Sequence, residues 1–226
     1  MNSFITDDGV AQRELHIILL CDCSGSMADR GKIATLNQAV REAIPVMQEV
    51  ARDNPSGKML VRCVSFANAA HWHIGTPTEV QQLLWQDLSA DGATEMGQAY
   101  KLVAQAMTVP PMPRSAYRPL IVLMTDGMPT SPTKNDLAEL MATPYGKRAF
   151  RTAIAIGHDA DHMELKRFIG NAEIPVLQAN NPDALREYIR YVTCVLSSVA
   201  MSPTSTAGTM QPTVPTAPSV AGPDVF

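Results

Sequence analysis

The most informative segment of this sequence is Ile17-Ile18-Leu19-Leu20-Cys21-Asp22-Cys23-Ser24-Gly25-Ser26-Met27. Its apolar run ends on Asp22, and Ser24 and Ser26 follow at alternate positions. This pattern predicts a buried strand followed by a helix, joined by a tight loop that carries three side-chain oxygens. Hard divalent cations such as Mg²⁺ prefer oxygen ligands in octahedral geometry. The stretch is therefore the first candidate for a metal site.

The size and charge of the chain limit the classes of protein it can belong to. At 226 residues and 24.4 kDa it is long enough for one sizeable core, with little left for a second domain. A net charge of −4, with no basic stripe, argues against nucleic-acid binding. Residues 1–13 lack the pattern of a signal peptide, and no apolar stretch reaches the ~18 residues of a membrane span. We therefore expect a cytoplasmic protein that binds neither nucleic acid nor membranes.

Apolar, strand-like runs alternate with amphipathic helical stretches along most of the chain. We expect strands at 15–22, 59–66, 72–74, 120–125, 149–156 and 174–178. We expect helices at 32–52, 78–85, 94–107, 135–142, 163–169 and 182–199. Pro45 should interrupt and kink the first of these helices, and Asn181 should cap the last, with Pro182 at its first position. The run 120–125 suits a central parallel strand, because such strands are covered on both faces.

This alternation predicts a single-domain α/β fold, a doubly wound, mostly parallel sheet with helices on both faces. In such sheets, ligands bind beyond the carboxyl ends of the strands. Near residue 201 the composition changes, and 202–206 and 209–218 are rich in Pro, Thr, Ser and Ala. Such a segment cannot bury enough surface to offset the entropy of ordering it. We therefore expect an N-terminal extension (1–13), a folded domain (14–199) and a Pro/Thr-rich disordered tail (200–226).

Cysteine and histidine do not form a recognisable metal motif in this sequence. Cys21 and Cys23 make one Cys-x-Cys unit, and zinc sites usually pair such a unit with a second one. We therefore expect small buried thiols rather than metal ligands or disulfides. His71 and His73 would share one strand face, but no third ligand is in view. We interpret them as ordinary strand histidines.

Two further junctions between a strand and a helix carry oxygen-bearing side chains. Gly92-Ala93-Thr94 precedes a predicted helix, and Thr125-Asp126-Gly127 follows the strand at 120–125. Each alone is weak evidence, because Asp-Gly is common in turns and Ser or Thr often caps a helix. Both lie at the same end of the predicted sheet as Asp22-x-Ser24-x-Ser26. The three together, in this order, are much more specific.

With these three junctions the chain resembles the von Willebrand factor A (VWA) domain family, over roughly residues 14–199. The metal-ion-dependent adhesion site (MIDAS) of that family combines an Asp-x-Ser-x-Ser loop, a Thr in a second loop and an Asp in a third. Matched residue by residue, the resemblance implies a metal site formed by Asp22, Ser24, Ser26, Thr94 and Asp126. It implies Mg²⁺ as the cofactor, or another hard divalent cation such as Mn²⁺ or Ca²⁺.

The resemblance also implies how such a site works. Ser24, Ser26 and Thr94 would offer neutral hydroxyls directly, whereas the two Asp residues could act through bound water. Neutral ligands leave the ion electrophilic, so that a carboxylate or phosphate from a partner finds a favourable sixth position. The alternative is an α/β protein that has lost metal binding and keeps these residues as caps and turns.

An enzyme is the second alternative. A hydrolytic metal site needs an activated water and a general base within hydrogen-bond reach. Both Asp residues are already needed to hold the ion. Glu95 stands at a predicted helix start, where a Glu usually interacts with the helix dipole. A phosphate-binding Gly-x-x-x-x-Gly-Lys-Ser/Thr loop is absent from the sequence. We therefore expect a binding protein, not an enzyme.

Within the family, the chain looks most like the intracellular bacterial proteins of the TerY-type tellurium-resistance group, in segments 22–27, 92–99 and 156–161. That resemblance implies a scaffold linked with a Ser/Thr protein kinase and a metal-dependent protein phosphatase, in tellurium resistance or a stress response. Tail Thr or Ser residues would then be phosphorylated, each gaining about −1.5 to −2 charge, unless the tail is inert. The alternative is an accessory subunit of an AAA+ ATPase of the MoxR or chelatase type.

Overall fold

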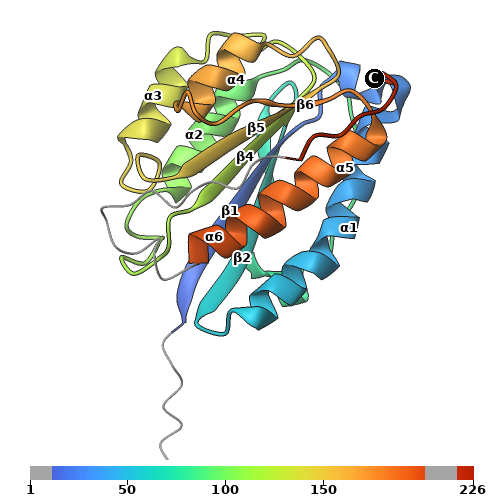
Figure 1. The fold of residues 1–226 in the computed structure, drawn as a ribbon. Helices are drawn as coiled ribbons and strands as arrows, with labels where there is room; N and C mark the ends of the chain where they lie inside the picture. Colours follow the sequence, from blue (N-terminus) through green and yellow to red (C-terminus); the bar gives the residue numbers. More distant parts are fainter. Residues whose placement is uncertain (1–11, 202–217) are drawn as a thin grey trace, which may run out of the picture.

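A six-stranded sheet forms the centre of the computed structural model, which describes residues 12–201 and 218–226 (Figure 1). Its strands are β1 (Arg13–Asp22), β2 (Gly57–Phe66), β3 (Ala70–Glu79), β4 (Leu120–Thr125), β5 (Phe150–Ile156) and β6 (Leu177–Ala179). The spatial order is β3-β2-β1-β4-β5-β6, and only the β2–β3 pair is antiparallel. The predicted doubly wound, mostly parallel α/β sheet is confirmed.

β1 lies at the centre of the sheet because it is apolar on both faces. Leu19 is paired with Cys63 of β2 on one side and with Val122 of β4 on the other. Odd-numbered residues from Leu15 to Cys21 belong to the hydrophobic core on one face, whereas Ile18 and Leu20 belong to the core on the other. This alternation is the period of two expected of a strand buried on both faces.

Helices cover both faces of the sheet (Figure 1). One face carries α1 (Lys32–Asp53), α5 (Pro182–Arg190) and α6 (Leu196–Met201), with a π-helical turn at Tyr191–Val195. The other face carries α2 (Met96–Ala106), α3 (Lys134–Ala142) and α4 (His162–Ile169). Two short 3-10 turns complete the described elements, η1 (Gly25–Gly31) and η2 (Val80–Gln82).

α1 is one continuous helix that packs through an apolar stripe. Leu36, Val40, Ala43 and Met47 are buried along this helix, at the three- and four-residue spacing of one helical face. The interruption expected at Pro45 is not found. Pro45 lies on the exposed side, where water can reach the backbone carbonyl that loses its helical donor.

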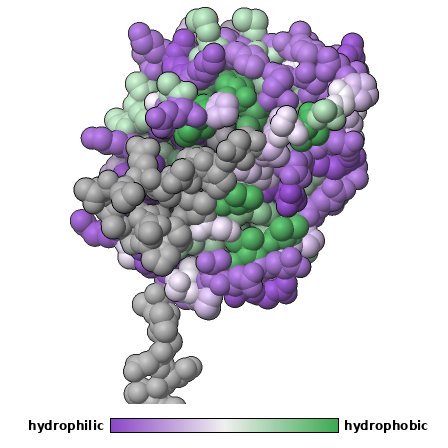
Figure 2. Space-filling model, viewed as in Figure 1, coloured by the Kyte–Doolittle hydropathy of each residue, from purple (hydrophilic) through white to green (hydrophobic). Residues whose placement is uncertain are grey.

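The outer surface of this side of the molecule is mostly hydrophilic. Figure 2 shows hydrophilic side chains over α1, with smaller hydrophobic patches near the middle of the face. None of the helices in the described residues combines the length and the hydrophobicity that a membrane span requires.

The helix expected at 78–85 is wrong. β3 continues to Glu79, which pairs with Leu60 of β2, and only the single turn of η2 follows. From Leu83 the chain runs as an irregular segment toward Thr94. The pairing of β3 with β2 outweighs the local helix-start signal. Pro77 is tolerated in this strand because β3 lies at the edge of the sheet.

Asn37 of α1 holds this irregular segment against the domain through hydrogen bonds. Its Nδ2 donates to the Leu88 carbonyl at 2.9 Å, and its Oδ1 accepts from Leu88 N at 2.9 Å and from Trp85 Nε1 at 3.1 Å. We expect Asn37→Ala to lower the free energy of unfolding by about 3 kcal/mol, because buried partners lose their hydrogen bonds. Urea unfolding followed by circular dichroism measures this change. Gln38→Ala is the matched control, since Gln38 bonds only at the surface, and should change it by less than about 0.5 kcal/mol; equal effects would contradict the role of Asn37.

The last residues of the sequence return to the domain instead of being disordered. Phe226 is only 4% exposed and belongs to the core beside α1 and α5. The backbone N–H groups of Val225 and Phe226 donate to the Asn180 carbonyl at 2.8 and 3.1 Å. The expected disorder is therefore wrong for 218–226, because the aromatic side chain of Phe226 is buried in the core. Residues 200 and 201, also expected in the tail, belong to the end of α6. Residues 202–217, with the Thr and Ser residues expected to be phosphorylated there, lie outside the described residues.

Candidate metal centre

The two central strands end side by side, and the chain leaves them toward opposite faces of the sheet. β1 leads into α1 on one face, and β4 leads into α3 on the other. This reversal of the strand order is the position where doubly wound sheets bind ligands. Three loops meet here: loop 1 (23–26), loop 2 (91–95) and loop 3 (126–130).

Backbone hydrogen bonds join the three loops into one unit. Gly25 N of loop 1 donates to the Gly92 carbonyl of loop 2 at 2.9 Å. Thr130 of loop 3 donates its N–H to the Thr94 carbonyl at 3.0 Å, and its hydroxyl accepts from Thr94 N at 2.9 Å. Loop 2 therefore lies between the other two, which fixes the position of Thr94.

Four of the five predicted site residues form a continuous chain of contacts. Ser24 N donates to Asp22 Oδ1 at 2.8 Å, and Ser24 Oγ lies 3.2 Å from Ser26 Oγ. The Ser26 hydroxyl donates to Asp126 Oδ1 at 2.7 Å. Ser26 is exposed, whereas Ser24 is only 2% exposed. Loop 1 therefore reaches the surface at Ser26, whereas the Ser24 hydroxyl lies below the surface.

Thr94 joins this group through the space above Gly127. A Cβ atom on Gly127 would lie 3.8 Å from Thr94 Oγ1 and 3.9 Å from Ser26 Oγ. Both hydroxyls therefore face the same point, and glycine leaves that point free. The structure brings all five predicted residues together, from three loops far apart in the sequence.

The spacing of these oxygens fits a small octahedral cation. Adjacent ligands about 2.1 Å from Mg²⁺ lie about 3.0 Å from each other. The Ser24–Ser26 and Ser26–Asp126 oxygen separations, 3.2 and 2.7 Å, are close to that value. Within the described part of the chain, no group of three or more His, Cys, Asp or Glu residues could hold a metal ion. Hydroxyl oxygens would therefore have to supply much of the coordination.

Asp22 is one of two fully buried acids in the centre. Its side chain is fully buried, and it accepts hydrogen bonds from Ser24 and from the hydroxyl of Thr125. Burial raises the pKa of Asp22, the nearby charge of Asp126 raises it further, and the hydrogen bonds oppose the rise. A cation in front of this carboxylate would favour its ionised form.

Lys32 is the member of the centre that the sequence analysis missed. Its Nζ donates to Asp126 Oδ2 at 2.7 Å, and the Lys and Asp residues are 5% and 0% exposed. A lysine at the start of a helix is ordinary in a sequence, and this one lies six positions after Ser26. Only the fold reveals that it reaches the carboxylate of loop 3.

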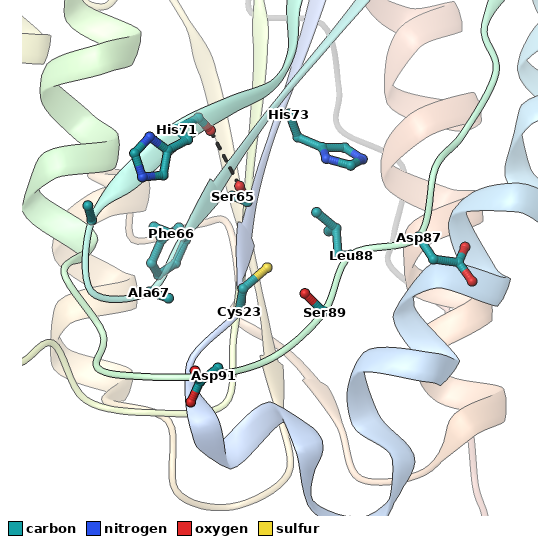
Figure 3. A pocket seen from close by; sticks show the side chains of 11 residues that line it. Cys23, Ser65, Phe66, Ala67, His71, His73, Asp87, Leu88, Ser89 and Asp91 are labelled. Carbon is teal, nitrogen blue, oxygen red and sulfur yellow. Dashed lines mark hydrogen bonds between the residues drawn. The ribbon is translucent and has the colours of Figure 1, made fainter.

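A cavity of about 310 Å³ lies beside loop 1 (Figure 3). Cys23, His71 and His73 line it, and the two imidazole rings do not point toward each other. His73 is hydrogen-bonded to the Gln86 carbonyl at 2.9 Å. All four cysteines are buried and free, as expected, and burial raises the pKa of the Cys23 thiol. The cavity therefore contains no second metal cluster among the described residues.

Comparison with solved structures places this fold among known ones. The chain is similar to a von Willebrand factor type A protein from Catenulispora acidiphila, with 20% identity and a TM-score of 0.62 over 81% of this chain and 42% of that one. It is similar to the ArnB paralog VWA2 from Sulfolobus acidocaldarius, with 15% identity and a TM-score of 0.60 over 80% of this chain and 45% of that one. A third is proximal thread matrix protein 1 of the mussel byssus, solved with a zinc-occupied MIDAS motif, with 19% identity and a TM-score of 0.61 over 81% of this chain and 49% of that one. At these identities the likeness shows the fold alone, and the chain spans less than half of each of the three.

Sequence comparison gives the family directly. No curated protein matches the chain. The sequence model of the von Willebrand factor type A domain matches residues 16–190, which include all three loops of the centre. The chain therefore belongs to the von Willebrand factor type A domain family.

Proposed function

We propose that this VWA domain is a metal-dependent protein-binding module. Asp22, Ser24, Ser26, Thr94 and Asp126 would hold Mg²⁺, or another hard divalent cation such as Mn²⁺ or Ca²⁺. An acidic or phosphorylated group of a protein partner would complete the coordination. The observation that carries this proposal is the convergence of three hydroxyls and two carboxylates from three loops at one edge of the sheet.

The chemistry of the donor set supports an ion that binds an external anion. When bound, the cation would supply the positive charge that an anionic side chain of a partner requires. Exposed Ser26 marks the side from which such a group would approach. The zinc-occupied MIDAS of the mussel byssus protein is a precedent within the same fold.

Binding is favoured over catalysis because both acids proposed to hold the ion already have hydrogen-bond partners. Asp22 accepts from Ser24 and Thr125, and Asp126 accepts from Ser26 and Lys32. Glu95 of loop 2 also has a partner, because its carboxylate accepts from the Ser131 hydroxyl at 2.9 Å. A general base would need a carboxylate or imidazole free to take a proton from water.

For the partner, we propose a Ser/Thr protein kinase and a metal-dependent protein phosphatase, in a module of the TerY type linked to tellurium resistance or stress. The support is the resemblance of segments 22–27, 92–99 and 156–161. A cytoplasmic location is part of the proposal, and four free, buried thiols accord with a reducing compartment. An accessory role for a MoxR- or chelatase-like AAA+ ATPase is the second candidate. Genes for a kinase and phosphatase beside this one would favour the first, and an ATPase gene the second.

The test is affinity purification with the immobilised full chain in Mg²⁺ and in EDTA. We expect a partner that is retained in Mg²⁺ and released by EDTA. Thr94→Val should abolish this retention, because it keeps the shape of the side chain and removes the hydroxyl. Thr94→Ser is the matched variant and should keep retention within about threefold, since it keeps the hydroxyl. The same proteins retained in EDTA, or by Thr94→Val, would contradict the proposal.

A further inference from the structure

The candidate metal centre contains a positive charge of its own. Lys32 Nζ donates to Asp126 Oδ2 at 2.7 Å, while Oδ1 of the same carboxylate accepts from the Ser26 hydroxyl at 2.7 Å. One oxygen of Asp126 therefore binds the ammonium group, and the other binds the Ser26 hydroxyl. The sequence motif for metal binding does not include this lysine.

The packing around Lys32 holds the ammonium group in this place. A Cβ atom on Gly157 would lie 3.6 Å from Lys32 Cε and 3.4 Å from Phe226 Cβ. Gly157, with a φ of +73°, leaves room for the lysine stem, and buried Phe226 adjoins it on the same side. Figure 1 shows this last segment, in red, ending beside η1 and the start of α1. Because its stem is enclosed and only 5% of the residue is exposed, Lys32 cannot turn into solvent without disturbing this packing.

The lysine changes the charge that a bound cation would meet. With both Asp residues ionised, Asp22 and Asp126 would just neutralise a divalent cation. Lys32 cancels one of these negative charges, so the occupied centre keeps one excess positive charge. In a buried setting such an excess is costly until a counter-ion arrives. One singly charged carboxylate restores neutrality.

We propose that Lys32 weakens binding of the bare cation and thereby couples it to binding of a singly charged carboxylate from the partner. The inference rests on the proposed function of the same site and specifies the charge of its ligand. Lys32 is a positioning residue, because it holds Asp126, and it makes firm cation binding conditional on the anion. By reciprocity, the anion binds firmly only when the cation is present.

The test is Mn²⁺ affinity, measured by titration calorimetry of the full chain in chloride and in acetate at equal ionic strength, with acetate as the carboxylate probe. We expect Lys32→Met to bind Mn²⁺ in chloride roughly tenfold more tightly, or more, than the native chain. Acetate should tighten Mn²⁺ binding of the native chain more than that of Lys32→Met. Arg30→Met is the matched control, because Arg30 is exposed in the same loop region, and should change the affinity less than about twofold.

Thermal unfolding supplies a second readout that does not depend on the partner. In EDTA, Lys32→Met should melt below the native chain, because buried Asp126 loses its counter-charge. Mn²⁺ should raise the melting temperature of Lys32→Met more than that of the native chain, since tighter binding stabilises more. If Lys32→Met does not fold without metal, Lys32→Gln is measured instead, with the same direction expected.

Two results would overturn the inference, and they differ in their consequence for the proposed function. If the native chain binds Mn²⁺ and the Lys32 variants bind it no more tightly, or if acetate acts equally on both, the coupling role of Lys32 is wrong and the metal site stands. If neither the native chain nor the variants bind Mn²⁺, both the inference and the proposed function are wrong.

Discussion

We expect Ser24→Ala combined with Ser26→Ala to abolish binding of divalent cations while the domain stays folded. The two hydroxyls lie 3.2 Å apart and are two of the three neutral ligands proposed for the ion. Replacing an outer partner of a metal ligand already costs about 10–100-fold in affinity. Losing two direct ligands should therefore cost roughly 100-fold or more.

The fold should survive this double substitution because its other contacts remain. Ser24 keeps the backbone N–H that donates to Asp22, and Asp126 keeps its ion pair with Lys32. The lost Ser26–Asp126 hydrogen bond should lower the free energy of unfolding by only about 1–2 kcal/mol.

Titration calorimetry with Mg²⁺ and thermal unfolding by circular dichroism measure the two effects separately. Ser56→Ala with Ser115→Ala is the matched control, because both residues are exposed and lie at the opposite end of the sheet. That control should bind Mg²⁺ as the native chain does. Native-like Mg²⁺ affinity in the Ser24 and Ser26 variant would contradict the assignment of these ligands.

A single acidic substitution in the central strand should unfold the whole domain. Val122 is fully buried in β4, where it pairs with Leu19 on one side and Thr152 on the other. Val122→Asp would place an unpaired carboxylate in this position. The cost of burying such a charge is comparable to the free energy of unfolding of a whole domain, ~5–15 kcal/mol. We expect insoluble protein, or protein without a cooperative thermal transition.

Leu84→Asp is the control for Val122→Asp. It makes the same kind of change, but Leu84 is 85% exposed, so we expect the melting temperature to stay within about 2 °C of the native value. Leu19→Asp, in β1, should fail as Val122→Asp does. A folded Val122→Asp protein with a native melting temperature would contradict the placement of β4 at the centre of the sheet.

The central sheet could be predicted from the sequence because its signals are local. The run from Ile17 to Leu20 and the run 120–124 are continuously apolar, and that pattern is typical of strands buried on both faces. The direction of β3 and the end of that strand could not be predicted. The helix-start signal near Thr78 is local, whereas the pairing of Glu79 with Leu60 depends on the finished sheet.

In the candidate site, too, local motifs could be predicted from the sequence, whereas tertiary contacts could not. Asp22, Ser24 and Ser26 form a contiguous motif, and Thr94 and Asp126 stand at recognisable junctions. No local motif identifies Lys32, because it joins the site through a contact with Asp126, 94 positions away in the sequence. The place of Phe226 was missed for a similar reason, since composition averages over a tail and overlooks one buried aromatic residue.

In the proposed site, three hydroxyls from two loops bind a hard divalent cation at the edge of the sheet. Anomalous diffraction from a crystal of the protein grown with Mn²⁺ and acetate would locate that ion. We predict an anomalous peak bounded by Ser24 Oγ, Ser26 Oγ and Thr94 Oγ1, each about 2.1 Å from the ion. A crystal with no peak among these atoms, or with its strongest peak at His71 or His73 in the neighbouring cavity, would show that the metal site is assigned wrongly.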